Sequence, residues 1–296
     1  MSKENSIGPL ETQSKASRLI FQDELVFDPT YTPEMICHRE KELTILSQLF
    51  LSLITAPNSV SRKIMITGPL HTGKTKTILL FTKMLTCAGR KRGVNFYTPY
   101  ISCRNHNTPE KILTELYTQV PSQKKRVNSR TRDLFRNPKT YKQRIPHFVI
   151  ILDDIEFFRG DWDTLLDAIS SRLLWNKNAT RISYIAILSN EIFLQFMPIK
   201  HNLKLIKNMI RFSQFDTYQV FDILKYRASL GFKPGVFTDG HIRMVADNAI
   251  KRCEGVTYGI KVLHWAGKLA QENHRSFIRY DDIRRAIIFT GAMWIG

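Results

Sequence analysis

Gly68-Pro-Leu-His-Thr-Gly-Lys-Thr75 has the spacing of a phosphate-binding P-loop, and the residues around it supply the context that such a loop requires. The apolar run at residues 63–67 predicts a strand before the loop, and the helical spacing of apolar residues over 75–85 predicts a helix after it. Strand, loop and helix in this order form the P-loop motif. A chance match to the four fixed positions would lack these flanks, so we interpret the loop as a binding site for nucleotide phosphates.

Each fixed residue of this loop has its own chemical task. Successive backbone N–H groups turn toward the β-phosphate, and glycine is needed because side chains would block that approach. Lys74 is expected to bind the β- and γ-phosphate oxygens, and Thr75 to give its hydroxyl oxygen to Mg²⁺. The predicted nucleotide-binding residues of the loop and the following helix are Gly68, Pro69, Leu70, His71, Thr72, Gly73, Lys74, Thr75 and Thr77.

Length and composition bound the class of protein. The chain has 296 residues, of which 43% are hydrophobic, and this is enough for two domains with sizeable cores. No run approaches the roughly 18 apolar residues that span a bilayer, and the polar residues 1–5 do not resemble a secretory signal. We therefore expect a cytoplasmic protein associated with the nucleoid, or a nuclear one in a eukaryote. Four cysteines without a CxxC pair predict neither a zinc site nor a disulfide framework.

The charge balance predicts a polyanionic partner. The chain carries 44 basic and 26 acidic residues, a net charge of +18, which attracts nucleic acid at long range. Over residues 124–144, nine side chains are Lys or Arg and Asp133 is the one acidic residue. This segment is either a solvated loop or a surface whose self-repulsion is relieved by a phosphate backbone. We expect no membrane partner, because no amphipathic helix accompanies it. The DNA-binding candidates are Lys124, Lys125, Arg126, Arg130 and Arg132.

A second apolar run, Phe148-Val-Ile-Ile-Leu-Asp-Asp154, ends in two carboxylates. Such an ending is common by itself, but after a P-loop it predicts a Walker B strand. Asp153 could then orient Mg²⁺ through water, and Asp154 could polarise an attacking water. The usual residue at the second position is Glu, which is longer by one methylene. This difference puts the rate of hydrolysis in question, because a shift of roughly 1 Å can cost about a hundredfold.

A third run, at residues 182–188, leads into Ser189 and Asn190. An Asn at the carboxyl end of a strand next to Walker B could hold the attacking water or the γ-phosphate. The alternative is an Asn that forms a turn, which this dipeptide also favours. We include Asn190 with Asp153 and Asp154 among the catalytic candidates, and Thr75 and Asp153 are the metal candidates.

The order of strand-like and helical patterns predicts the fold class and the domains. Strand-like runs alternate with helical patterns in the first two thirds of the chain, as in an α/β protein with a parallel sheet flanked by helices. From about Phe215 only helical patterns follow, which predicts a second, small all-helical domain. The predicted boundaries are 1–17 for a flexible tail, 18–212 for the P-loop α/β domain and 213–296 for the helical domain.

Taken together, these motifs resemble the AAA+ replication initiators of the origin-recognition and cell-division-cycle type, particularly the archaeal members. The likeness covers about residues 20–290. Besides the P-loop, it is carried by Phe21-Gln-Asp-Glu24, Tyr31-Thr-Pro33, His38-Arg-Glu40, Ser102-Cys-Arg104, Leu152-Asp-Asp-Ile-Glu156, Leu188-Ser-Asn190, Phe221-Asp-Ile-Leu-Lys-Tyr-Arg227 and Gly231-Phe-Lys-Pro-Gly235. The resemblance implies an AAA+ core with a lid, ATP and Mg²⁺ as cofactors, and duplex DNA bound non-specifically or with weak specificity. Self-association, other AAA+ initiator subunits and a helicase are the further partners it implies.

The resemblance also assigns roles to single residues. It implies that Tyr31, Pro33, His38 and Arg39 lie near the adenine, that Asn190 is sensor 1, and that the basic stretch overlaps a DNA-contacting insertion of initiators. From the residues alone, Tyr31 could equally be a packing residue at a domain edge and Arg39 a surface charge.

Three departures from the family pattern bear on function. Thr257 stands where the lid usually offers an arginine to the γ-phosphate, and Lys200 falls near the arginine usually offered to a neighbouring subunit. The chain ends at Gly296, where relatives of this type continue into a winged-helix domain. We therefore expect a DNA-binding switch with weak ATP hydrolysis. The alternatives are an ATP-bound scaffold for another initiator subunit and a P-loop ATPase of a mobile-element or defence system.

Overall fold

The computed structural model describes residues 20–57, 59–119, 147–162, 164–165, 169, 182–196, 208–252 and 254–292. The chain divides into two compact units. Residues 39–69 and 73–213 form an α/β unit, and residues 1–38, 70–72 and 214–296 form a helical unit. None of the helices in the described part of the chain has the length and apolarity that a membrane crossing requires.

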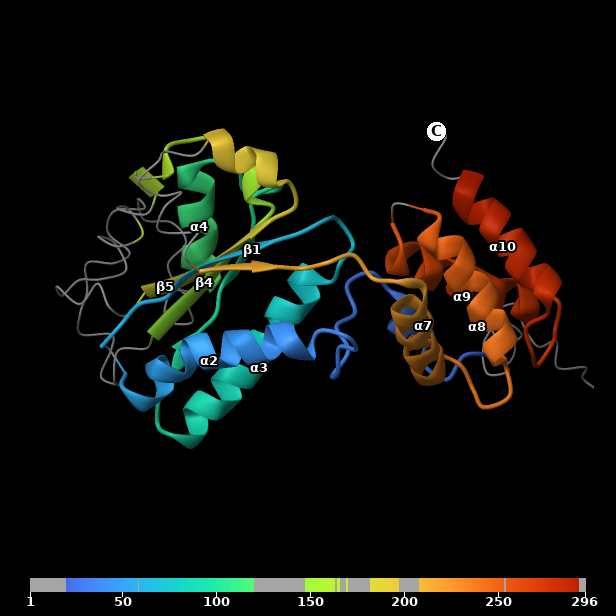
Figure 1. The fold of residues 1–296 in the computed structure, drawn as a ribbon. Helices are drawn as coiled ribbons and strands as arrows, with labels where there is room; N and C mark the ends of the chain where they lie inside the picture. Colours follow the sequence, from blue (N-terminus) through green and yellow to red (C-terminus); the bar gives the residue numbers. More distant parts are fainter. Residues whose placement is uncertain are drawn as a thin grey trace, which may run out of the picture. The chain divides into compact units, whose positions relative to one another are not determined.

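The α/β unit contains a sheet in which every described strand pairing is parallel, as predicted (Figure 1). The strand order is β2-β4-β5-β1-β6, and β3 also pairs with β4. The strands are β1 (Lys63–Thr67), β2 (Phe96–Tyr97), β3 (Tyr100–Ser102), β4 (His147–Asp153), β5 (Ile182–Leu188) and β6 (Met209–Arg211). Both β4 and β5 are buried along their whole length, which explains their nearly unbroken apolar runs.

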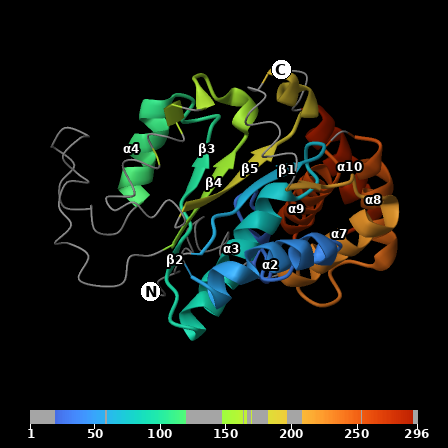
Figure 2. The same cartoon turned by 60° about the vertical axis from the view of Figure 1, so that its left-hand side comes forward.

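Helices cover both faces of this sheet (Figure 2). Ile150 and Leu152 pack toward α4 (Pro109–Gln119) on one face. The alternate residues Val149 and Ile151 pack toward helices on the opposite face. Those helices are α2 (Glu40–Thr55) and α3 (Lys74–Lys91). Because side chains alternate along a strand, Asp153 points to the same face as Ile151, where α3 begins.

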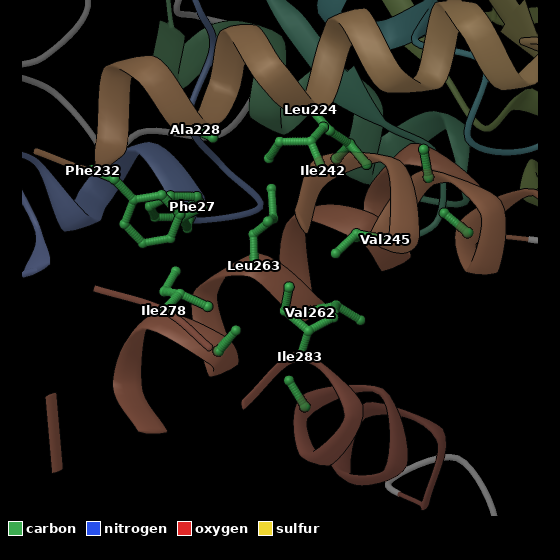
Figure 3. Packing of buried hydrophobic residues seen from close by; sticks show 14 of the residues in the cluster. Phe27, Leu224, Ala228, Phe232, Ile242, Val245, Val262, Leu263, Ile278 and Ile283 are labelled. Atoms are coloured by element: carbon green, nitrogen blue, oxygen red, sulfur yellow. The ribbon is translucent and has the colours of Figure 1, made fainter. Parts of the chain in front are cut away.

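The helical unit consists of four α-helices among its described residues, and this confirms the predicted all-helical lid. They are α7 (Thr217–Gly231), α8 (Asp239–Ile250), α9 (Val256–Glu272) and α10 (Tyr280–Ala292). Capping boxes begin α7 and α8, with Asp216 and Gln219 at the first and Thr238 and His241 at the second. Leu224, Val245, Leu263 and their neighbours form the apolar core of this unit (Figure 3).

The segment at residues 20–38 packs in the helical unit, although the sequence suggested that it belongs with the P-loop domain. The ring of Phe27, in a short 3-10 helix η1 (Glu24–Phe27), lies 4.7 Å from that of Phe232, and Figure 3 shows the two together. The backbone N–H of Gln22 donates to the Gly231 carbonyl at 2.8 Å. Aromatic burial and backbone pairing thus tie this early segment to the end of α7.

Candidate nucleotide-binding site

The two glycines of the loop occupy backbone positions that other residues would strain. Gly68 has φ of +141° and Gly73 has φ of +80°. A Cβ on Gly68 would lie 2.2 Å from the Phe212 carbonyl oxygen. Glycine at this position therefore also lets the backbone after β1 approach the backbone after β6 closely. Thr77 donates to the Gly73 carbonyl at 2.9 Å and is buried, so its hydroxyl stabilises the first turn of α3.

Lys74 is the first residue of α3, and its side chain is folded against its own loop. It is only 6% exposed, and its ammonium donates to the carbonyls of Gly68 at 2.7 Å and Pro69 at 2.6 Å. Burial lowers the pKa of Lys74, while the nearby carboxylates of Asp153 and Glu156 oppose that shift. A buried ammonium held by neutral carbonyls is well placed to exchange them for anionic phosphate oxygens.

Thr75 and Asp153 are brought together, as a shared metal site requires. The Thr75 hydroxyl donates to Asp153 Oδ2 at 2.7 Å, and Asp153 is 4% exposed. Burial raises the pKa of Asp153, and the hydrogen bonds it accepts from Thr75 and Tyr100 oppose the shift. Hard oxygen donors fit Mg²⁺, which is usually held by one or two protein groups together with substrate phosphates.

Asp154 has a strained backbone and an ionic partner, Arg104, that lies 50 positions away in the sequence. Its φ is +55°, in the left-handed region. Arg104, which follows β3, donates from Nε to Asp154 Oδ2 at 3.2 Å. The guanidinium of Arg104 also lies 4.1 Å from the ring centre of Phe157. The parallel register of β3 and β4, in which Ser102 lies opposite Asp153, places Arg104 beside Asp154, and the sequence carries no signal for this register.

Asn190 lies just after β5, and its side chain supports a local turn. Its Oδ1 accepts from the backbone N–H of Ile192 at 3.0 Å, as in the turn alternative that the sequence left open. The neighbouring Ser189 N–H donates to Glu156 Oε1 at 3.2 Å and so joins the ends of β4 and β5. Glu156, which received no role from the sequence, has a buried Oε2 without a protein partner. Burial raises the pKa of Glu156.

The residues expected near the adenine have several structural contacts. In the helical unit, the Tyr31 ring lies 4.8 Å from the guanidinium of Arg227, and His38 Nε2 lies 3.0 Å from Asp222 Oδ2. Pro33 is buried. Arg39, in the α/β unit, is 2% exposed and donates to the Ser213 carbonyl at 2.7 Å, so the surface-charge interpretation of this residue is wrong.

The other predicted residues of the loop differ in their exposure and backbone conformation. Leu70 is 55% exposed, Thr72 is buried and His71 has φ of +60°. Thr257 lies in the first turn of α9. The residues Lys124, Lys125, Arg126, Arg130, Arg132 and Lys200 lie outside the described part of the chain.

These features together define the class of the protein. A strand leads through a glycine-bounded loop into a helix that begins with a buried Lys and a Thr. An Asp at the end of another strand, on the face of the parallel sheet that this helix covers, accepts a hydrogen bond from the hydroxyl of that Thr. This is the arrangement of a P-loop protein of the α/β class.

Comparison with known proteins places the chain within this class. The profile described as AAA domain matches residues 59–195, and the profile described as Cdc6 AAA+ ATPase-type lid domain matches residues 221–287. ORC1-type DNA replication protein 1 of Archaeoglobus fulgidus is 26% identical over 273 residues, covering 92% of this chain and 66% of the relative. The ORC1-type DNA replication protein of Methanosphaera stadtmanae is 28% identical over 281 residues, covering 90% and 69%. The chain thus matches an AAA domain followed by a Cdc6-type lid domain, and it is similar over most of its length to ORC1-type DNA replication proteins of archaea.

Solved structures share the fold of the chain. Cdc6p of Pyrobaculum aerophilum has a TM-score of 0.74 at 24% identity, covering 90% of this chain and 71% of that one. The Aeropyrum pernix ORC2 protein, in ADPNP-ADP complexes, has a TM-score of 0.79 at 20% identity and covers 92% and 73%. The Aeropyrum pernix ORC1 protein in complex with DNA has a TM-score of 0.76 at 22% identity and covers 90% and 69%. The chain thus spans about two thirds of the length of these relatives.

Proposed function

We propose that the protein binds ATP and Mg²⁺ at the P-loop and binds duplex DNA as a replication-initiator-like switch that hydrolyses ATP slowly. The observation that carries this proposal is the contact between the start of α3 and the end of β4, where Thr75 donates to the buried Asp153. Lys74 lies beside Thr75 with its ammonium among carbonyl acceptors. A fold does not need a buried lysine next to buried carboxylates, so these groups point to a charged ligand.

The residues of the chain have distinct tasks in this proposal. Lys74 binds phosphate oxygens in place of its own loop carbonyls, and its desolvation strengthens that attraction. Thr75 and Asp153 provide oxygen ligands for Mg²⁺, directly or through water. When bound, Mg²⁺ neutralises charge on the phosphates. The same Aeropyrum pernix ORC2 protein that shares this fold was solved in ADPNP-ADP complexes, which supports nucleotide as the ligand.

Slow hydrolysis follows from the surroundings of Asp154. Its short side chain is paired with Arg104 at 3.2 Å, so a cation competes with an attacking water for one of its carboxylate oxygens. Thr257 cannot supply the charge of an arginine, and Lys200 lacks the planar fork of the guanidinium group. These three features support a nucleotide-controlled switch with weak turnover.

Two observations support DNA as the partner: the net charge of the chain, and a DNA complex of a protein with the same fold. A net charge of +18 gives long-range attraction to phosphate backbones, and a relative of the same fold was solved in complex with DNA. Contacts to phosphates predict binding of duplex DNA with little sequence preference. Other initiator subunits, a helicase or a second copy of the chain are the proposed protein partners.

A second candidate function is an ATP-bound scaffold for another initiator subunit. The pairing of Arg104 with Asp154 favours it, because a carboxylate that stays paired would leave ATP intact. Nucleotide would then stabilise the fold by mass action without turnover. A role in a mobile-element or defence system stays a further alternative.

The nucleotide proposal is tested by titrating a fluorescent ATP analogue with Mg²⁺ into the wild type and Lys74→Ala. We expect Lys74→Ala to weaken binding by about a hundredfold or more, because a charge-assisted contact to phosphate is lost from a desolvated site. Lys83→Ala is the matched control, since Lys83 is an exposed lysine of the same helix. Equal affinity of wild type and Lys74→Ala would refute the site.

The DNA proposal is tested by fluorescence anisotropy of a labelled random-sequence duplex with Mg·ATP, with Mg·ADP and without nucleotide. Tighter binding with ATP than with ADP supports the switch. Equal binding in all three states would separate the P-loop from DNA, and no binding would favour the scaffold. Neutralising Lys124, Lys125 and Arg126 should lower the salt dependence of binding by about one unit of slope per lost phosphate contact.

A further inference from the structure

Tyr100 contacts the strand-end carboxylate from the neighbouring strand. In the parallel register of β3 and β4, Tyr100 lies opposite Ile151, and Ser102 lies opposite Asp153. Tyr100 and Asp153 are therefore diagonal neighbours on one face, a distance that only a long side chain bridges. The Tyr100 hydroxyl does so, since it donates to Asp153 Oδ2 at 2.8 Å.

Hydrogen bonds to the backbone of Tyr100 fix the position of this hydroxyl. The amide of Gln119, at the end of α4, donates to the Tyr100 carbonyl at 2.8 Å and accepts from the Tyr100 N–H at 3.0 Å. Gln119 itself donates to Glu115 at 2.7 Å. These contacts hold Tyr100 so that its hydroxyl is directed at the carboxylate of Asp153.

Asp153 consequently has little bonding capacity to spare. A carboxylate accepts at about four lone-pair sites. Thr75 and Tyr100 both donate to Oδ2, and the Asp154 N–H donates to Oδ1 at 2.9 Å. One site on Oδ1 is left, which suffices for a single water or a single metal contact but not for bidentate coordination.

We propose that Tyr100 is a positioning residue that restricts Asp153 to one further contact and thereby sets the preference of the nucleotide site for Mg²⁺ over Ca²⁺. Mg²⁺ keeps an octahedral shell with several waters and needs few carboxylate bonds, whereas Ca²⁺ takes six to eight ligands and commonly binds carboxylates through both oxygens. Removing the Tyr100 hydroxyl opens a site on Oδ2 and makes the bidentate mode available. This inference rests on the proposed nucleotide function.

The experiment measures the affinity of the full chain for a fluorescent ATP analogue, with Mg²⁺ alone and with Ca²⁺ alone. Tyr100→Phe is expected to raise the ratio of Ca²⁺-supported to Mg²⁺-supported affinity by about fivefold over the wild type, a change of the size that one typical hydrogen bond controls. Tyr97→Phe is the matched control. Tyr97 lies in β2, just before β3 in the chain, and its ring packs on Phe148 in the apolar cluster on the α4 side of the sheet, away from Asp153. This control should leave the ratio unchanged.

A second variant guards against a folding defect. Gln119→Ala keeps the Tyr100 hydroxyl but releases its backbone, so it should move the ratio in the same direction by a smaller factor. Thermal melts without metal report whether each variant is folded. An unchanged ratio in Tyr100→Phe and Gln119→Ala would overturn the inference alone. A wild type whose nucleotide affinity does not respond to metal would overturn the proposed function together with the inference.

Discussion

Buried polar side chains serve different purposes in the α/β unit and in the helical unit. In the α/β unit the buried Lys74 and Asp153 gather with the half-buried Thr75 at one edge of the sheet, where β1 and β4 end and α3 begins. In the helical unit Asp282 and His241 instead lie in the first turns of α10 and α8. There they accept backbone N–H groups that the helix itself leaves unpaired.

The fold needs the buried acceptors of the helical unit for its stability, whereas the buried charges of the α/β unit add no stability to the fold. Burial lowers the pKa of Lys74 and raises that of Asp153, so in both residues the charged form is disfavoured relative to water. The first-turn acceptors of the helical unit, by contrast, satisfy donors that would otherwise be orphaned. Matched substitutions should therefore affect ligand binding in the α/β unit and stability in the helical unit.

The largest expected effect on stability is that of Asp282→Asn. Asp282 is 2% exposed, accepts two hydrogen bonds of 2.6 Å from Arg275 and accepts the Arg279 N–H at 2.8 Å. Loss of its charge should cost about 2 kcal/mol, below the range for fully buried pairs because Arg275 is partly exposed. Thermal unfolding should show a Tm several degrees lower, with nucleotide affinity of the folded protein unchanged. A Tm equal to that of the wild type would contradict the comparison.

Asp153→Asn is the matched substitution in the α/β unit and should have a smaller effect on stability. The variant loses the carboxylate but also its desolvation cost, so we expect stability within about 1 kcal/mol of the wild type. The dependence of nucleotide affinity on Mg²⁺ should nevertheless weaken strongly, since Asp153, which accepts the Thr75 hydroxyl, is the proposed metal ligand. Thermal melts and metal titrations of the same preparation measure both quantities. A loss of stability as large as that of Asp282→Asn would erase the distinction between the two units.

Local patterns predicted the architecture of both units. The apolar run of β4 and the glycine-bounded loop before α3 depend on neighbours in the sequence, and so do the helical spacings after Phe215. Burial of both sheet faces explains why the strands are apolar throughout, and this signal can be read without a structure. The contact of Thr75 with Asp153 could also be anticipated, because carboxyl ends of parallel strands meet at one edge of the sheet.

Contacts between distant parts of the sequence could not be predicted in this way. Arg104 reaches Asp154 and Tyr100 reaches Asp153 only through the register of β3 against β4, which the sequence does not specify. The burial of Arg39 depends on the carbonyl of Ser213, which is 174 positions away. Likewise, Phe27 packs on Phe232 although the sequence gives no sign that the two segments meet. Such pairings depend on the tertiary fold and determine how each charged group is satisfied.

The smallest predicted effect is a pH dependence within the helical unit. His241 Nδ1 accepts the Thr238 N–H at 3.2 Å in the capping box of α8, and this requires an unprotonated nitrogen. Burial lowers the pKa of His241 below 6.5, although the charge of Asp282 opposes this, and the ring of Tyr280 packs against the imidazole at 4.4 Å. Because the folded pKa lies below the unfolded one, the unfolded chain binds more protons in that interval, and stability falls as the pH drops below about 6.5.

His241→Gln isolates this effect, because Gln219 occupies the equivalent position in the capping box of α7 and accepts the Asp216 N–H at 3.2 Å. The variant keeps an acceptor at the start of α8 but removes the titrating group. Its Tm at pH 7.5 should match that of the wild type, and its decrease between pH 7 and 5.5 should be smaller. Since both proteins share every other histidine, the difference between their pH profiles belongs to this site. Identical profiles would mean that His241 accepts a proton in the folded helical unit as readily as in the unfolded chain, and that its place in the capping box does not depend on charge.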